Sequence, residues 1–130
     1  MGPPNYLMRK NKNISSTKIR KFIEKGKLKE ASLMLGRPVT ILGTVVGGRR
    51  IGRKIGFPTA NINPHHEAIP PSGVYDVNVR LNRKIYSGVV NIGITPTFGK
   101  NKESRVELHI INFKRNIYGK DVEIIFKKLL

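Results

Sequence analysis

The chain has 130 residues, with 25 lysines and arginines against 8 acidic residues and a net charge of +17. It contains no cysteine, which excludes disulfide bonds and thiolate metal sites. It has no long apolar run, which excludes a membrane-spanning helix, and its polar first residues lack the apolar core of a signal peptide. This length suits one domain, and we expect a cytoplasmic protein.

The positive charge has two interpretations. A cationic surface attracts anions such as nucleotide phosphates or nucleic acid. The chain is also rich in lysine, asparagine and isoleucine, a composition typical of A/T-rich genomes, and we favour this as the origin of the overall charge. The net charge therefore informs solubility and encounter with anions rather than fold.

Two short helices joined at Gly26 are predicted over residues 14–36, after a flexible lead-in at 1–13. Each carries apolar residues at helical spacing. The second ends at Gly36, with Pro38 two positions later, because glycine readily takes the left-handed conformation that terminates a helix. The two helices therefore form a helical hairpin.

Short runs of β-branched residues follow Pro38, broken by Gly, Pro and Asn. They predict strands at 39–46, 73–81, 84–92, 104–113 and 121–129. Alternation in 73–81 puts four apolar side chains on one face, and Asn82-Arg83 suits a tight turn before the next strand. Strands spaced this closely favour an antiparallel barrel or sandwich.

Residues 43–64, GTVVGGRRIGRKIGFPTANINP, combine glycines, cations, a threonine and an asparagine. Glycines let the backbone approach an anion closely, and arginine and lysine pair with phosphates. The Thr59 hydroxyl and the Asn61 amide are oxygen donors of the kind that Mg²⁺ accepts. A flexible basic hairpin with a Pro-Thr turn would explain the same residues, and their chemistry alone leaves the two interpretations about even.

Glu107 lies in the predicted strand 104–113. Alternation places Val106, Leu108 and Ile110 on the core face and Glu107 on the other. A solvent-facing carboxylate is the ordinary interpretation of a single glutamate. Acidic residues are scarce here, however, and the face of Glu107 becomes apolar further along the strand. We therefore expect this face to be partly covered, a setting that suits a general base.

Residues 91–99, NIGITPTFG, hold asparagine, glycines and proline at the exit of a strand. This composition predicts a shaped loop rather than a regular strand. An ordinary rim loop and a ligand-lining loop are about equally compatible with it.

Several segments, in this order, resemble the riboflavin kinase domain: GRKIGFPTANI, GVYDV, NIGITPTF, RVELHIINF and IYGKDVEIIF. ISSTKIRKFIEKGKLKEASLMLGRPV resembles the segment that joins the halves of bacterial bifunctional riboflavin kinase/FMN adenylyltransferase (FAD synthetase). The resemblance covers residues 14–129. It implies a mainly β fold: a six-stranded antiparallel Greek-key barrel over 37–130, preceded by the helical hairpin at 14–36. It also implies that a C-terminal segment of the family is truncated here.

The resemblance further implies ATP-dependent phosphorylation of the ribityl 5′-hydroxyl of riboflavin, giving FMN and ADP. Glu107 would be the catalytic base, and Thr59 and Asn61 would bind Mg²⁺ or another divalent cation. The residues implied to bind ATP and its phosphates are Gly47, Gly48, Gly52, Arg53, Lys54, Gly56, Pro58, Thr59 and Asn61. Those implied to line the flavin site are Asn91, Gly93, Thr95, Pro96, Thr97 and Phe98.

The expected partners are riboflavin, FMN, ATP and ADP, with no nucleic acid and no membrane, and we expect a monomer. The chain lacks the H-x-G-H motif of the adenylyltransferase half, so no FMN adenylyltransferase activity is expected from it alone. Linkage to an adenylyltransferase domain in a longer protein stays open.

Two alternative functions stay open as well. A basic small barrel could bind nucleic acid, although the absence of tryptophan and an aromatic share of 7% supply few stacking surfaces. A catalytically silent flavin-binding domain is the second, because the truncated C-terminal segment leaves flavin affinity in doubt.

Overall fold

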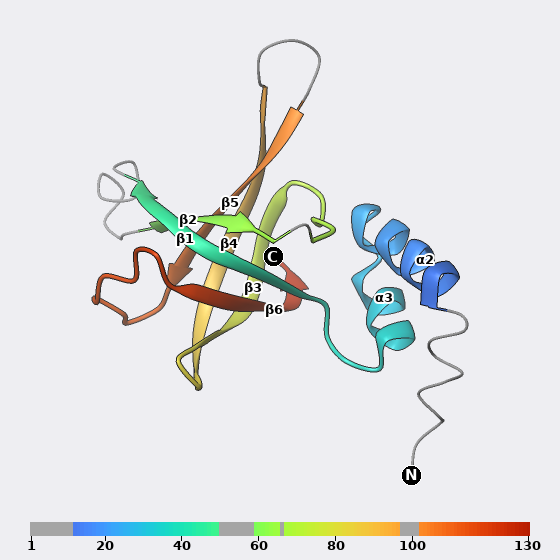
Figure 1. The fold of residues 1–130 in the computed structure, drawn as a ribbon, viewed down its shortest axis with the longest axis horizontal. Coiled ribbons are helices and arrows are strands. Elements are labelled where there is room, and N and C mark those ends of the chain that lie inside the picture. The colour runs from blue at the N-terminus through green and yellow to red at the C-terminus, as the bar shows by residue number, and fades with distance from the viewer. Residues whose placement is uncertain (1–11, 50–58, 66, 97–101) are drawn as a thin grey trace.

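The computed structural model describes residues 12–49, 59–65, 67–96 and 102–130. Its strands are β1 (Thr40–Arg49), β2 (Thr59–Pro64), β3 (Gly73–Leu81), β4 (Lys84–Pro96), β5 (Lys102–Ile110) and β6 (Asp121–Leu129). They form a closed barrel in the order β1-β2-β5-β4-β3-β6, and every neighbouring pair is antiparallel (Figure 1). The expected six-stranded antiparallel barrel is confirmed.

The barrel interior is filled by apolar side chains from alternate strand positions. In β3 every second residue from Tyr75 to Leu81 is buried, as the alternation in 73–81 predicted. Val106, Leu108 and Ile110 of β5 are likewise buried. No charged or polar side chain is fully buried among the residues that the structure describes. The core is therefore held together by apolar burial, worth roughly 25 cal/mol per Å² removed from water.

The turn between β3 and β4 is the tight one that the sequence predicted. Asn82 and Arg83 both have positive φ angles, 52° and 71°. Two consecutive left-handed residues are the geometry of a type I′ turn, whose twist matches that of the strands it joins. β3 and β4 consequently pair without interruption from Leu81↔Lys84 to Gly73↔Ile92.

β2 is a strand that the sequence analysis did not predict, because the glycines, cations and proline before it suggested a loop or turn. Its inner positions are nevertheless apolar: Ile62 is buried, and Ala60 packs against the core. β2 pairs with β1 on one side and with β5 on the other. Ladder hydrogen bonds on both sides outweigh the weak strand propensity of this short segment.

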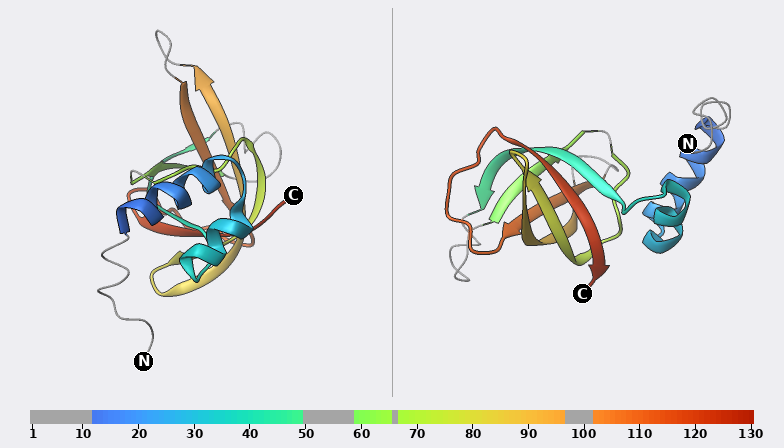
Figure 2. Two further views of the ribbon diagram at one scale, coloured as in Figure 1. Left: turned by 90° about the vertical axis from the view of Figure 1, so that its right-hand side faces the viewer. Right: turned by 90° about the horizontal axis from the view of Figure 1, so that it is seen from below.

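The expectation of a shaped loop at 91–99 is wrong for its first six residues. β4 runs regularly through Pro96, paired with β5 from Gly88↔Ile110 to Pro96↔Lys102. Pro96 is tolerated because it stands at the strand end. Figures 1 and 2 show that this end of the β4–β5 hairpin projects beyond the barrel. Residues 97–99 lie outside the described part of the chain.

The two predicted helices are present as α2 (Lys12–Glu24) and α3 (Leu28–Leu35). Gly36 ends α3 with a φ of 73° and donates its N–H to the Ser32 carbonyl at 2.8 Å, as the C-terminal glycine predicted. Ile23 and Ala31 are buried and belong to the same apolar cluster as the barrel core. Figure 2 shows the hairpin beside one end of the barrel. Neither helix, within the described residues, is long and apolar enough to cross a membrane.

Tyr75 is the aromatic anchor of β3. Its ring packs edge-to-face with Phe126, with centroids 5.3 Å apart, and its hydroxyl donates to the Pro71 carbonyl at 2.7 Å. Burial raises the pKa of the Tyr75 hydroxyl above its ordinary value. The neutral, hydrogen-bonded phenol is therefore the form that suits the fold.

The backbones of β1 and β2 approach each other closely at Gly43. A Cβ there would lie 2.5 Å from Cγ2 of Ile62 and 3.0 Å from the Asn63 carbonyl oxygen, whereas a Cβ at Gly47 would meet nothing within 4 Å. We expect Gly43→Ala to lower the free energy of unfolding by about 1–3 kcal/mol through overpacking. Gly47→Ala on the same strand should change it by less than about 1 kcal/mol. Urea unfolding measures both, and equal stabilities would contradict the close approach.

Candidate functional site

Three polar residues form a row across the outer face of the barrel. Glu107 of β5 is the direct cross-strand partner of Asn61 on β2 and of Asn91 on β4. Its neighbours Val106 and Leu108 point into the core, so Glu107 faces outward as predicted. Direct partners in a sheet have Cβ atoms about 4.5–5.5 Å apart, within reach of one another's side chains. The carboxylate therefore lies between two amide side chains.

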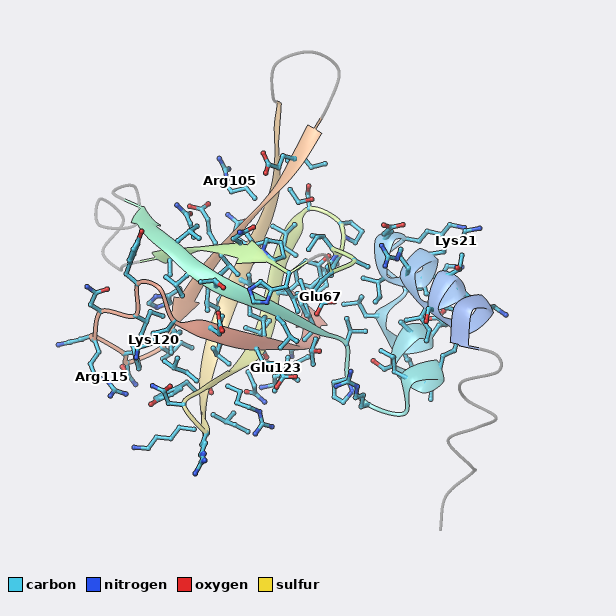
Figure 3. All side chains as sticks on the ribbon, in the orientation of Figure 1. Lys21, Glu67, Arg105, Arg115, Lys120 and Glu123 are labelled. Carbon is cyan, nitrogen blue, oxygen red and sulfur yellow. The ribbon has the colours of Figure 1, made fainter. Side chains whose placement is uncertain are left out.

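Glu107 is largely covered although it lies on the outer face. Its side chain is only 15% exposed, and the Arg105 guanidinium lies 3.5 Å from it, Nε to Oε1, with 43% of the Arg105 side chain exposed. Figure 3 shows Arg105 on the β4–β5 hairpin. Gly93 pairs with Arg105, and a Cβ at Gly93 would lie 3.4 Å from the guanidinium, so the glycine leaves room for it. The predicted partial covering of Glu107 is confirmed.

Thr59 begins β2 next to the end of β1, where it pairs with Arg49. Its Oγ1 is buried and has no hydrogen-bond partner among the described residues. A buried hydroxyl without a partner costs about 1–3 kcal/mol, so such an atom in a native fold indicates a ligand or water that supplies the missing bond. Asn61 is two residues further along the strand and shares the side of Thr59, about 7 Å away. Thr59, Asn61 and Glu107 thus follow one stripe.

A cavity of about 440 Å³ opens at the end of the barrel next to Thr59. This volume lies in the range of small-molecule sites. Its floor is formed by strand residues and its wall by the connection between β5 and β6. The lining residues are Val45, Gly47, Thr59, Ala60, Leu108, Ile110, Phe113, Lys114, Arg115, Asn116, Ile117 and Tyr118. An apolar floor beside an unpartnered hydroxyl and two cations fits an anionic ligand with an apolar part.

The wall, residues 111–120, is an irregular segment whose two ends are fixed to the strands. The Ile111 N–H donates to the Ser87 carbonyl at 2.9 Å. At the other end, the Gly119 N–H donates to the Val45 carbonyl at 2.8 Å and the Val45 N–H donates to the Lys120 carbonyl at 2.9 Å. Figure 1 and the right-hand view of Figure 2 place this segment at the end of the barrel away from the helices.

This wall was not predicted from the sequence: its first three residues, 111–113, were expected to belong to the strand 104–113, but β5 ends at Ile110. The available signal was FKRN at 113–116, an aromatic residue, two cations and an asparagine within a connection between strands. Such residues are common in solvated loops, so this pattern does not indicate a cavity. Their position depends on hydrogen bonds to β1 and β4, which are far away in the sequence.

The predicted site residues fall into several groups. Gly47 and Thr59 meet at the cavity, Gly48 pairs with Ala60 beside it, and Asn61, Glu107 and Asn91 form the row. Thr95 and Pro96 belong to the far end of the projecting hairpin, about 13 Å beyond Asn91 along the strand. The other predicted residues lie outside the described part of the chain: Gly52, Arg53, Lys54, Gly56, Pro58, Thr97 and Phe98.

A divalent cation fits this donor set if water and a substrate phosphate supply its remaining ligands. No group of three or more histidine, cysteine or acidic residues that could hold a metal occurs among the described residues. The protein therefore offers no complete cage there, but a buried hydroxyl at Thr59 with the Asn61 amide nearby. Mg²⁺ typically keeps waters and substrate phosphates as ligands and takes few from the protein. The residues thus fit a cation that arrives with a phosphate.

Comparisons with known proteins find one family over most of the chain. Residues 35–130 match the family model described as riboflavin kinase. The bifunctional riboflavin kinase/FMN adenylyltransferase of Listeria monocytogenes is 46% identical over 85% of this chain and 36% of its own length. The protein of the same description from Haemophilus influenzae is 45% identical over 87% of this chain and 37% of its own length.

Two further relatives carry different descriptions. The RNA-binding riboflavin kinase RibR of Bacillus subtilis is 45% identical over 67% of this chain and 38% of its own length. A solved structure described as a macrolide-efflux protein from Streptococcus pneumoniae superposes with a TM-score of 0.79 at 38% identity, covering 88% of this chain and 38% of that one.

The chain spans about two fifths of the length of the curated relatives it matches. The family model nevertheless covers the whole barrel, from the end of α3 to the end of the chain. The row of Asn61, Glu107 and Asn91 and the cavity beside Thr59 lie within this matched part. The chain therefore belongs to the riboflavin kinase family.

Proposed function

We propose that this domain transfers the γ-phosphoryl group of ATP to the ribityl 5′-hydroxyl of riboflavin, giving FMN and ADP. The observation that carries the proposal is the alignment of Glu107, Asn61 and Thr59 along one stripe that ends at the 440 Å³ cavity. Phosphoryl transfer is assisted by a base near the acceptor hydroxyl and by charge stabilisation at the phosphates, with the attacking and leaving oxygens in line on phosphorus. Along the stripe, Glu107 is the proposed base, and Asn61 and Thr59 lie on the side of the proposed phosphates.

The cavity is the proposed ATP site. Its apolar floor, which includes Leu108 and Ile110, suits a nucleobase, while Gly47 and Thr59 at its edge suit the phosphates. Lys114 and Arg115 place positive charge in the wall. The remaining residues proposed for the phosphates are those of the stretch between β1 and β2, which the structure does not describe: Gly52, Arg53, Lys54, Gly56 and Pro58.

Thr59 and Asn61 are the residues proposed to hold the divalent cation that accompanies ATP. The unpartnered Thr59 hydroxyl and the oxygen of the Asn61 amide support this assignment. When bound, such a cation neutralises charge on the phosphate oxygens. Mg²⁺ is the proposed ion, because oxygen donors without sulfur or a histidine cluster suit a hard cation.

Riboflavin is proposed to bind on the outer face of the barrel next to Glu107, along β4. Asn91 lies directly opposite Glu107, and Gly93, two residues further along the same face, carries no side chain and lies beside the Arg105 guanidinium. Thr95 and Pro96 continue this strand, and Thr97 and Phe98 follow them in the sequence. We propose that these four residues contact the flavin.

Glu107 is proposed to act as the general base. Its carboxylate accepts the proton of the 5′-hydroxyl while the hydroxyl oxygen forms a bond to the γ-phosphorus of ATP. The bond between that phosphorus and the β–γ bridging oxygen breaks, and ADP leaves with its electron pair. Positioning dominates such a reaction, and a general base typically contributes about 10²–10⁴-fold.

The proposed activity is tested by incubating the purified chain with riboflavin, ATP and Mg²⁺ and separating the products by chromatography. We expect FMN and ADP in equal amounts. A parallel incubation with FMN in place of riboflavin should give no FAD, because the chain carries no H-x-G-H motif. No FMN in the first incubation, together with salt-sensitive binding of single-stranded DNA, would instead favour the nucleic-acid-binding alternative.

Glu107→Gln is expected to lower kcat by about 10²–10⁴-fold, because an amide cannot accept the proton. The KM for ATP should stay close to that of the wild type, since Glu107 does not line the cavity. Glu123→Gln is a matched control: Glu123 also lies on a strand, is 23% exposed and pairs with an arginine, Arg80, at 3.1 Å. Steady-state kinetics should show normal turnover for the control, and an unchanged kcat for Glu107→Gln would exclude the base assignment.

Thr59→Ala is expected to raise the Mg²⁺ concentration needed for half-maximal activity, because the variant lacks the buried hydroxyl. Thr59→Ser keeps a hydroxyl at the same position and should restore most of the wild-type response. Titration of activity with MgCl₂ at fixed ATP compares the three proteins. Identical titration curves for wild type and Thr59→Ala would rule out Thr59 as a ligand.

A further inference from the structure

The middle of the cavity wall is held by side chains rather than by the backbone. Among the described residues, the backbone hydrogen bonds that join the wall to the strands lie at its two ends, at Ile111 and at Gly119–Lys120. Within the wall, the Tyr118 N–H donates to Oδ1 of Asn116 at 2.9 Å, which shapes a local turn but does not reach the barrel. An irregular segment with few barrel contacts would be mobile unless its middle were also fixed.

Phe113 and Ile117 pack against the barrel core. Arg115, Tyr86 and Phe113 add a second contact, which fixes the polar part of the wall. Nη2 of Arg115 donates to the Tyr86 hydroxyl at 2.9 Å. The Arg115 guanidinium also lies over the Phe113 ring, 4.9 Å from its centroid, and Phe113 packs edge-to-face with Tyr86 at 5.0 Å. Each of the three side chains contacts the other two, and we call Arg115, Tyr86 and Phe113 the clamp. Tyr86 belongs to β4, so the clamp joins the wall to the barrel.

Lys114 and Arg115 both line the cavity, but only Arg115 belongs to the clamp. Arg115 uses its guanidinium on Tyr86 and Phe113, and Figure 3 shows it on the β5–β6 connection. Lys114 lines the same cavity. Tyr86 itself does not line the cavity, so it can affect a ligand there only through the wall.

We propose that Tyr86 is a positioning residue for the nucleotide: through Arg115 it holds the wall of the cavity in its binding conformation. The proposal rests on the proposed function, in which the cavity takes ATP. Ordering a binding segment before the ligand arrives removes an entropic cost from binding, so loss of the clamp weakens affinity without removing any ligand contact. The clamp itself is exposed at Arg115 and adds little to global stability.

Tyr86→Phe tests this role because it removes only the hydroxyl that accepts from Arg115. The net worth of one hydrogen bond corresponds to a rise of about three- to tenfold in the KM for ATP. The value of kcat should stay within about twofold, since the reacting groups lie elsewhere. Tyr75→Phe is the matched control. The Tyr75 hydroxyl also makes one hydrogen bond, which it donates to the Pro71 carbonyl, and its ring also packs edge-to-face with a phenylalanine, but Tyr75 does not line the cavity.

Arg115→Lys supplies a second variant that keeps the charge but not the planar fork. It should raise the KM for ATP to a similar extent, and Tyr86→Phe should add nothing in the Arg115→Lys background, because both changes break the same contact. Calorimetric titration of each protein with ADP and Mg²⁺ measures nucleotide affinity in the same cavity without turnover. Thermal unfolding of each variant confirms that it is folded.

The outcomes separate the two proposals. Weaker ADP binding in Tyr86→Phe but not in Tyr75→Phe supports the clamp, whether or not FMN is formed. A wild-type protein that binds ADP but makes no FMN contradicts the proposed function alone. Equal ADP affinity in wild type and Tyr86→Phe, or additive losses in the double variant, overturns the clamp.

Discussion

The register that places β5 between β2 and β4 is the constraint on which the site depends. A closed antiparallel barrel has no free edge within its ring, so each strand is fixed on both sides. Glu107 is consequently set opposite Asn61 and Asn91 at once. A slip of one residue in β5 would turn Glu107 inward and Val106 outward, which apolar burial forbids. The packing of the core thus fixes the position of the backbone that carries the carboxylate.

Much of this fold could be predicted from the sequence. The alternation of Tyr75, Val77, Val79 and Leu81 is nearly uninterrupted, and the burial of these side chains follows it directly. Helix-ending glycines and the Asn82-Arg83 turn carry local signals that tertiary structure does not override. β2 could not be predicted from its own residues, because a short strand between two others is held by its neighbours rather than by propensity.

In the site, too, residue types could be predicted from the sequence, but contacts between distant segments could not. Thr59, Asn61 and Glu107 could be singled out from residue types and from the family resemblance, but periodicity alone could not bring β2 next to β5. The wall could not be predicted, because Phe113 and Arg115 are ordered by Tyr86, almost thirty residues earlier. The regular continuation of β4 to Pro96 was likewise hidden, since its glycine and proline look like loop residues in isolation.

The pairing of β1 with β6 has a consequence for how the domain forms. Thr40 pairs with Ile125, so the first and last strands of the barrel are neighbours. The ring cannot close until the final strand is available, and the remaining strands would until then expose two unpaired edges. Contacts this distant in sequence slow folding. During synthesis on the ribosome, one edge of β1 therefore stays unpaired until β6 has emerged. The core is completed only after that step.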